Sequence, residues 1–69
     1  MKVSARNTLP GVVKSIKRGA VNAEVMLEVA PGLNIVSVIT LDAVKTLALK
    51  KGKIAYAVIK ASSVIIGID

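Results

Sequence analysis

Apolar and polar residues alternate along residues 21–29, and this alternation is the clearest structural signal in the chain. The odd positions are apolar and the even ones mostly polar: Val21, Ala23, Val25, Leu27 and Val29 against Asn22, Glu24, Met26 and Glu28. Successive side chains of a strand point to opposite faces, so the segment is predicted to be a strand with one buried face. Residues 11–18 also favour a strand, and Gly19 between the two segments predicts a hairpin.

A second turn and a third strand are predicted next. Pro31 and Gly32 are typical of a turn, because proline presets its backbone angle and glycine accepts the left-handed conformation. Both faces of residues 33–39 are apolar, with Leu33, Ile35 and Ile39 on one face and Val36 and Val38 on the other. Each face therefore needs a cover, and in so short a chain we expect a second subunit to provide it.

The rest of the pattern predicts one short helix and two more strands. Thr40 suits a helix N-cap, and the apolar residues after it follow helical spacing: Leu41, Val44, Leu47 and Ala48. Gly52 is expected to end the helix. Residues 53–60 and 64–68 favour a fourth and a fifth strand, and residues 3–6 a short strand at the edge. This order predicts an all-β fold, an OB-like five-stranded Greek-key barrel with one short helix between strands three and four.

Composition limits the size and the setting of this fold. The chain has 69 residues, 54% of them hydrophobic, with Tyr56 as the one aromatic and no Cys, His or Trp. We expect residues 1–69 to form one domain, and without disulfides or the usual metal ligands, oligomerisation is the expected source of extra stability. The first residues lack the apolar core of a signal peptide, and no apolar run reaches the roughly 18 residues of a membrane span. We therefore expect a cytoplasmic protein that does not contact membranes.

A net charge of +6 predicts an anionic partner. Catalysis is not expected, because His and Cys are absent. Glu24 and Glu28 would lie about 13 Å apart on a strand, beyond the roughly 5–9.5 Å of catalytic carboxylate pairs. Single-stranded nucleic acid is disfavoured, since one tyrosine cannot build a platform on which bases stack. Duplex binding through lysine and phosphate stays open, and a basic OB-type nucleic-acid-binding module is the alternative function.

A small tetrahedral oxyanion needs a few convergent N–H and O–H donors and one or two cations. Residues 4–7 place the hydroxyl of Ser4 two positions from the guanidinium of Arg6, on the same face of an extended segment. Residues 60–63 place the ammonium of Lys60 beside two serine hydroxyls and a break between strands. Surface charge and turn capping explain the same residues equally simply, so this pattern alone does not decide between the two interpretations.

Four segments, taken in order, resemble the Mop domain of the molbindins, the molybdenum-pterin-binding protein family: residues 4–7, 19–25, 38–40 and 59–64. The resemblance extends over essentially the whole chain and is closest to the stand-alone members. It implies an OB-like barrel that assembles as a homohexamer, a trimer of dimers. It also implies that molybdate or tungstate binds between subunits and that the protein stores and buffers these oxyanions. The ion would be bound whole, with no protein atom as a direct metal ligand.

The resemblance also assigns residues to two kinds of site. The interface site corresponds to seven residues: Ser4, Ala5, Arg6, Thr40, Lys60, Ala61 and Ser62. A second site near the three-fold axis corresponds to the hairpin residues Gly19, Ala20, Val21 and Asn22, which would act largely through backbone amides. Thr40 is explained equally well as a helix cap. Arg6 and Lys60 would supply charge in the interface site, and Ser4 and Ser62 hydrogen bonds.

Overall fold

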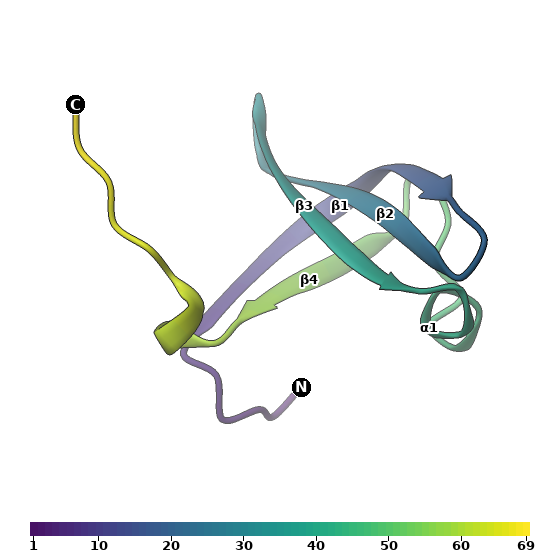
Figure 1. Ribbon diagram of the computed structural model, residues 1–69, viewed down its shortest axis with the longest axis horizontal. Helices are drawn as coiled ribbons and strands as arrows, with labels where there is room; N and C mark the ends of the chain where they lie inside the picture. Colours follow the sequence, from purple (N-terminus) through teal and green to yellow (C-terminus); the bar gives the residue numbers. More distant parts are fainter.

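The computed structural model describes residues 1–69 as one curled antiparallel sheet with a short helix at one end (Figure 1). The elements along the chain are β1 (Asn7–Arg18), β2 (Asn22–Ala30), β3 (Leu33–Thr40), α1 (Leu41–Thr46), β4 (Ile54–Ile59) and a 3₁₀ turn, Ala61–Ser63. The strands lie in the order β3-β2-β1-β4. The prediction of an all-β fold with one short helix between the third and fourth strands is confirmed. No helix is long and apolar enough to cross a membrane.

Strand β1 pairs with two neighbours, and this curls the sheet. Residues 7–12 pair with β4 and residues 12–18 with β2. Gly11 lies where the two partners meet, and a Cβ atom there would lie 2.6 Å from the carbonyl oxygen of Glu28. No side chain fits into that space, so glycine is what allows β1 to pass so close to β2.

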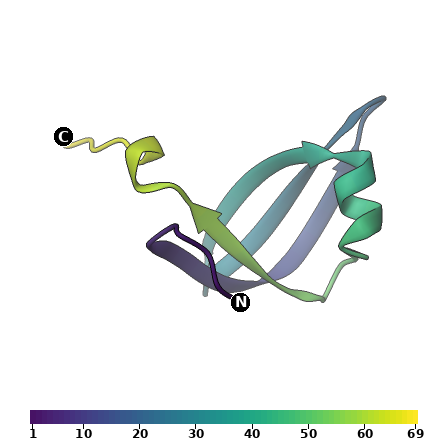
Figure 2. The ribbon, with the colours of Figure 1, turned by 90° about the horizontal axis from the view of Figure 1, so that it is seen from below.

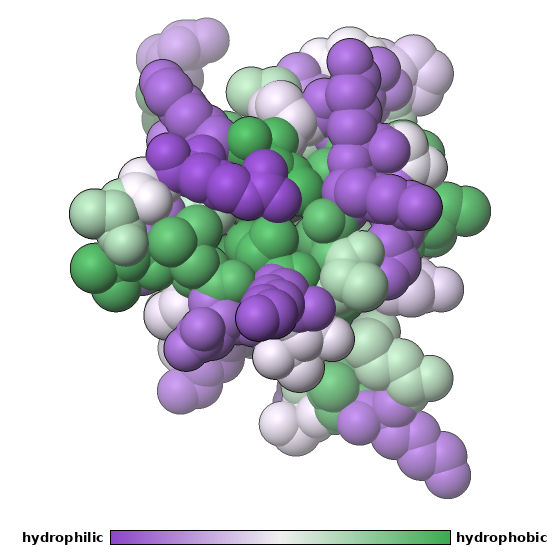
Figure 3. All heavy atoms as spheres, turned by 90° about the vertical axis from the view of Figure 1, so that its right-hand side faces the viewer, coloured by the Kyte–Doolittle hydropathy of each residue, from purple (hydrophilic) through white to green (hydrophobic).

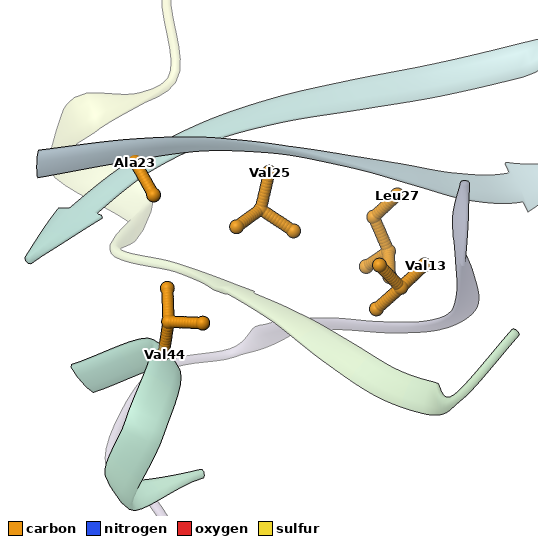
Figure 4. Close-up of a cluster of buried hydrophobic side chains, with 5 residues drawn as sticks. All are labelled: Val13, Ala23, Val25, Leu27 and Val44. Carbon is orange, nitrogen blue, oxygen red and sulfur yellow. The ribbon is translucent and has the colours of Figure 1, made fainter. Parts of the chain in front are cut away.

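The buried core lies between the concave side of the sheet and α1 (Figure 4). It consists of five aliphatic side chains: Val13, Ala23, Val25, Leu27 and Val44. Figure 4 shows Val44 of α1 pointing toward β2, and Val13 of β1 lying against Leu27. The three β2 residues in this core are odd-numbered, which confirms the buried face predicted from the alternation.

Helix α1 is shorter than predicted, because the chain leaves the helix at Ala48 and not at Gly52. The N–H of Leu49 donates to the carbonyl of Val44, and the N–H of Ala48 to that of Lys45, each over 3.0 Å. This pair of bonds is a Schellman ending, in which glycine usually occupies the left-handed position. Here Ala48 adopts that conformation, with a φ of 51°. The prediction of Gly52 as the helix end was wrong because an alanine takes the left-handed position.

The turn between α1 and β4 is hydrogen-bonded to the end of α1 and to β1. The Nζ atom of Lys53 donates to the carbonyls of Leu47 over 2.7 Å and Ala48 over 3.2 Å, so its ammonium closes the carboxyl end of the helix. On the other side, the N–H of Gly52 donates to the carbonyl of Val13 over 2.8 Å, and the N–H of Val13 donates to the carbonyl of Lys53 over 2.9 Å. Gly52 has a φ of 90° and makes the turn itself.

Strand β3 is an edge strand with an apolar, uncovered outer face. Val36 and Val38 on this face are more than half exposed, whereas Ile35 and Ile39 are half-buried on the inner face. Leu33, at the start of the strand, alternates with the inner-face residues but is exposed. The prediction that both faces are apolar is confirmed. The outer face has no cover within the single chain.

The predicted fifth strand, residues 64–68, is wrong for the single chain. After the 3₁₀ turn the chain end runs away from the sheet (Figure 1). Ile65, Ile66 and Ile68 are 92%, 84% and 94% exposed. Their side chains favour a strand, but a strand needs a free edge, and the 3₁₀ turn directs this segment away from both edges of the sheet. The short strand predicted for residues 3–6 is also absent, because the ladder with β4 begins only at Asn7.

Candidate oxyanion site

The start of β1 and the end of β4 bring the two predicted donor segments together. Asn7 pairs with Ile59 across the ladder, so residues 3–6 and 60–62 leave the sheet side by side (Figure 2). Between them lies a hollow of about 710 Å³, lined by Val3, Ser4, Ala5, Arg6, Val58, Lys60, Ala61 and Ser62. Six of the seven residues predicted for the interface site therefore meet in one place.

The polar groups of this hollow have no partners within the chain. The one ion pair of the protein joins Lys14 to Glu28 over 3.9 Å, so neither Arg6 nor Lys60 faces a carboxylate. The hydroxyls of Ser4 and Ser62 take part in none of the side-chain hydrogen bonds. No acidic residue lines the hollow. The hollow therefore holds two cations and two hydroxyl groups and no carboxylate. Such a set of donors is suited to binding an anion.

The 3₁₀ turn leaves further donors at the same place. Its own hydrogen bonds run from the N–H of Ser63 to the carbonyl of Lys60 over 2.8 Å, and from that of Val64 to the carbonyl of Ala61 over 3.3 Å. The preceding N–H groups, those of Ala61 and Ser62, lie outside this pattern, as the first amides of any helical turn do. The segment therefore offers main-chain donors next to the Lys60 ammonium.

Thr40 lies at the other end of the molecule. It ends β3, pairs with Asn22 and caps α1, where its Oγ1 accepts a hydrogen bond from the N–H of Ala43 over 3.0 Å. The helix-capping interpretation of Thr40 is therefore confirmed. The residue does not line the hollow at the start of β1, and a single chain does not bring it to the other six residues.

The predicted three-fold residues form the tip of the β1–β2 hairpin, beside Thr40. The N–H of Gly19 donates to the carbonyl of Asn22 over 2.8 Å, and the carbonyl of Val21 accepts from the N–H of Leu41 over 2.9 Å. The amides of Ala20 and Val21 make no backbone hydrogen bond. Two free main-chain donors thus remain at the hairpin tip, which is consistent with a site that works through backbone amides.

Comparison with known proteins gives the family. Residues 3–66 match the TOBE domain, a span that includes both segments of the hollow. The chain is 51% identical to the probable molybdenum-pterin-binding protein of Haemophilus influenzae over the whole length of both chains. It is 48% identical to molybdenum-pterin-binding protein 1 of Clostridium pasteurianum, over 96% of this chain and 97% of that one. The chain belongs to the TOBE-domain family of molybdenum-pterin-binding proteins.

Solved structures of similar proteins have the same fold. The TM-score to MopII from Clostridium pasteurianum is 0.91, at 46% identity over 97% of this chain and all of that one. The TM-score to ModG, described as a cytoplasmic molybdate-binding protein and solved with molybdate bound, is 0.95, at 54% identity. All of this chain matches 49% of the ModG chain. The resemblance to the molbindins and the prediction of an OB-like fold are confirmed, with four strands in the single chain in place of five.

Two residues of the hollow in this TOBE domain were missed by sequence reasoning. Val3 and Val58 form its apolar lining next to the charged groups. Val58 lies two positions before Lys60, which directly follows β4. In the strand predicted for residues 53–60, alternation gives both residues the same face, so the signal was present in the sequence. Both valines are exposed, as are Arg6 and Lys60, so the hollow is open to solvent in the single chain.

Proposed function

We propose that this protein binds molybdate or tungstate in the hollow between residues 3–6 and 60–62. The observation that carries the proposal is that Arg6 and Lys60 lie in one hollow without a carboxylate partner. A tetrahedral dianion needs two positive charges and several donors, which these residues supply. Relatives over the full length of the chain are described as molybdenum-pterin-binding proteins, and this supports molybdate over other dianions.

Each group has a separate role in this site. The guanidinium of Arg6 donates two parallel hydrogen bonds, while the ammonium of Lys60 acts as a point charge. The hydroxyls of Ser4 and Ser62 and the amides of Ala61 and Ser62 donate to the remaining oxygens. A charge-assisted hydrogen bond contributes about 1.5–3 kcal/mol, so a few of them account for micromolar binding, about 8 kcal/mol. No bond is formed or broken, so the protein acts by binding and not by catalysis.

We propose that the protein functions as a homo-oligomer. A groove of about 620 Å³ lies between β3 and β4, and 14 of its 16 lining residues are hydrophobic. Residues 64–68 are apolar and without a partner in their own chain, and they match the apolar lining of this groove. The same segment of a second copy would close the open side of the barrel. The resemblance to the molbindins supports six such copies, a homohexamer built as a trimer of dimers.

Assembly also gives Thr40 a place in the interface site. Its hydroxyl hydrogen is free to donate, because Oγ1 only accepts in the helix cap. Thr40 of a second subunit would complete the set of donors around the anion. The hairpin tips, residues 19–22, would meet at the three-fold axis and offer the amides of Ala20 and Val21 to a second class of site.

The cellular role that follows from reversible oxyanion binding is storage and buffering of molybdate or tungstate. Residues 1–69 would act as a single Mop domain, and a cytoplasmic location fits the description of ModG. Release needs only dissociation, because every contact in the proposed site is a hydrogen bond or an ion pair.

Isothermal titration of the ion-stripped oligomer with molybdate and with tungstate tests this function. We expect heat and saturation with both ions and weaker binding in Arg6→Ala. Lys17→Ala, which removes one positive charge outside the hollow, serves as the control and should bind as the wild type does. The absence of heat in the ion-stripped wild type, or equal losses in the two variants, would remove the hollow as the site.

A further inference from the structure

Most of the positive charge of this protein lies away from the oxyanion hollow. Of the ten Lys and Arg residues, Lys2, Arg6 and Lys60 belong to the terminal segments, which leaves seven on the second half of β1, on α1 and in the turn after it. Figure 3 views the molecule from the α1 side and shows hydrophilic side chains projecting around a smaller hydrophobic area. Oxyanion binding in the hollow makes no use of this charge.

Five lysines near the α1–β4 turn form what we call the basic turn surface: Lys14, Lys45, Lys50, Lys51 and Lys53. The hydrogen bonds between Val13, Gly52 and Lys53 fix the turn against β1 next to Lys14. A shallow hollow of about 590 Å³ in this surface is lined by Ala48, Lys50, Lys51, Gly52 and Lys53. The backbone of the turn that carries Lys50, Lys51 and Lys53 is therefore hydrogen-bonded to β1, beside Lys14.

The charges of Lys50 and Lys51 are not used by the fold. Lys53 caps the helix, and Lys14 faces Glu28 over 3.9 Å. Lys50 and Lys51 make neither an ion pair nor a side-chain hydrogen bond, and both are exposed. Their backbone amides also donate to no backbone carbonyl. The centre of the surface thus presents two ammonium groups and two N–H donors to solvent.

We propose that the basic turn surface binds the phosphodiester backbone of duplex nucleic acid. Duplex DNA carries one negative charge per roughly 1.7 Å, and lysines that neutralise phosphates release the counterions condensed around it. Binding of this kind needs clustered ammonium groups and no aromatic platform. It therefore suits a surface of lysines that contains neither Tyr56 nor any other aromatic residue. This interaction is independent of the oxyanion site.

The chemistry of the surface favours phosphates over a protein partner. Lysine is depleted in the centres of protein interfaces, where apolar and aromatic residues gather. The hollow in the turn has no apolar side chain larger than the methyl group of Ala48. The same surface of a second copy is disfavoured as the occupant, because an isologous contact would place like charges opposite each other.

Fluorescence anisotropy with a labelled DNA duplex of about 16 base pairs, titrated at salt concentrations from about 50 to 200 mM, tests the proposal. We expect the logarithm of the binding constant to fall linearly with that of the salt concentration. In the double variant Lys50→Gln/Lys51→Gln this slope should be smaller by about 2, at about 0.9 for each lost phosphate contact. Neither side chain takes part in the fold, so the variant should keep the wild-type circular dichroism spectrum.

Lys2→Glu is the matched control, because it lowers the net charge by the same two units outside the basic turn surface. It should keep the wild-type slope, and saturating molybdate should not displace the duplex. The proposal would be overturned if the duplex does not bind at about 50 mM salt, or if molybdate displaces it. It would also be overturned if the slope is the same in the wild type and the double variant, or if the double variant and Lys2→Glu lose the same amount of duplex affinity. A poly-L-glutamate chain that binds as tightly as the duplex would assign the surface to acidic proteins and so also contradict it.

Discussion

The two ends of the sheet differ in what their polar groups do. At the α1 end, Thr40 caps the start of the helix and Lys53 its end, and the turn that follows is bonded to β1. At the opposite end, Arg6 and Lys60 have no partner. Donors that are already hydrogen-bonded stabilise the fold, whereas convergent donors left free are available to a ligand. Lys50 and Lys51 at the α1 end are also unpaired, but no hydroxyl group lines their hollow. The proposed oxyanion site therefore lies at the end where a guanidinium, an ammonium and two serine hydroxyls line one hollow.

The largest effect is expected at the corner of β1 that connects the two ends. A Cβ atom in Gly11→Ala would lie 2.6 Å from a backbone oxygen and 2.9 Å from Leu27, so β1 and β2 must separate. We expect a loss of about 2–3 kcal/mol in the free energy of unfolding, together with weaker molybdate binding. Urea unfolding at one fixed protein concentration measures the loss. Wild-type stability would show that the sheet has room at this point.

Arg6→Ala should affect the ligand and not the fold. The guanidinium has no partner in the free chain, so the free energy of unfolding without molybdate should stay within about 0.5 kcal/mol of wild type. Molybdate binding should weaken by about 2 kcal/mol, the value of a charge-assisted hydrogen bond. Titration calorimetry and urea unfolding on the same sample separate the two quantities. A variant that loses stability but not affinity would assign Arg6 to the fold.

Lys53→Met at the α1 end is expected to have the opposite effect to Arg6→Ala, on the fold and not on the ligand. The substitution keeps the aliphatic part of the side chain and removes the ammonium that donates to the carbonyls of Leu47 and Ala48. We expect a loss of about 1 kcal/mol in the free energy of unfolding and unchanged molybdate affinity. If affinity falls as much as in Arg6→Ala, the two ends are not separate in function.

The smallest effect is expected from Ala48→Gly, which should stabilise the protein. Ala48 has a φ of 51° at the helix end, a conformation that costs a residue with a Cβ atom about 1–2 kcal/mol. Part of this gain is lost to the greater freedom of glycine in the unfolded chain, so a net gain of about 0.5 kcal/mol is expected. Thermal unfolding measures it, with Ala20→Gly in the exposed hairpin as the control.

Sequence reasoning succeeded where one strand determines its own burial. The alternation of residues 21–29 predicted the buried face of β2, because β2 lies inside the sheet and has only one face toward the core. It was less successful where the conformation of a segment depends on whether another strand is available to pair with it. Residues 64–68 have strand composition, but no edge of their own chain is within reach, so the predicted strand is absent.

The same distinction applies to the candidate site. Ser4, Arg6, Lys60 and Ser62 meet because the pairing of β1 with β4 brings the two ends of the chain together, which sequence order alone did not show. Thr40 lies at the other end because β3 runs toward α1, and only an assembly can bring it to the hollow. The helix end was missed because Lys53, seven positions beyond α1, helps to hold Ala48 in a conformation that alanine disfavours.

The central claim is that Arg6 and Lys60 act together on one bound oxyanion. A double-mutant cycle tests it most directly, with molybdate titrated into the wild type, Arg6→Ala, Lys60→Ala and the double variant. If both groups contact the same ion, each single variant should weaken binding strongly. The double variant should then differ from the sum of the single losses by about 0.5 kcal/mol or more. Losses that add within about 0.3 kcal/mol, or a double variant that binds as the wild type does, would contradict the account.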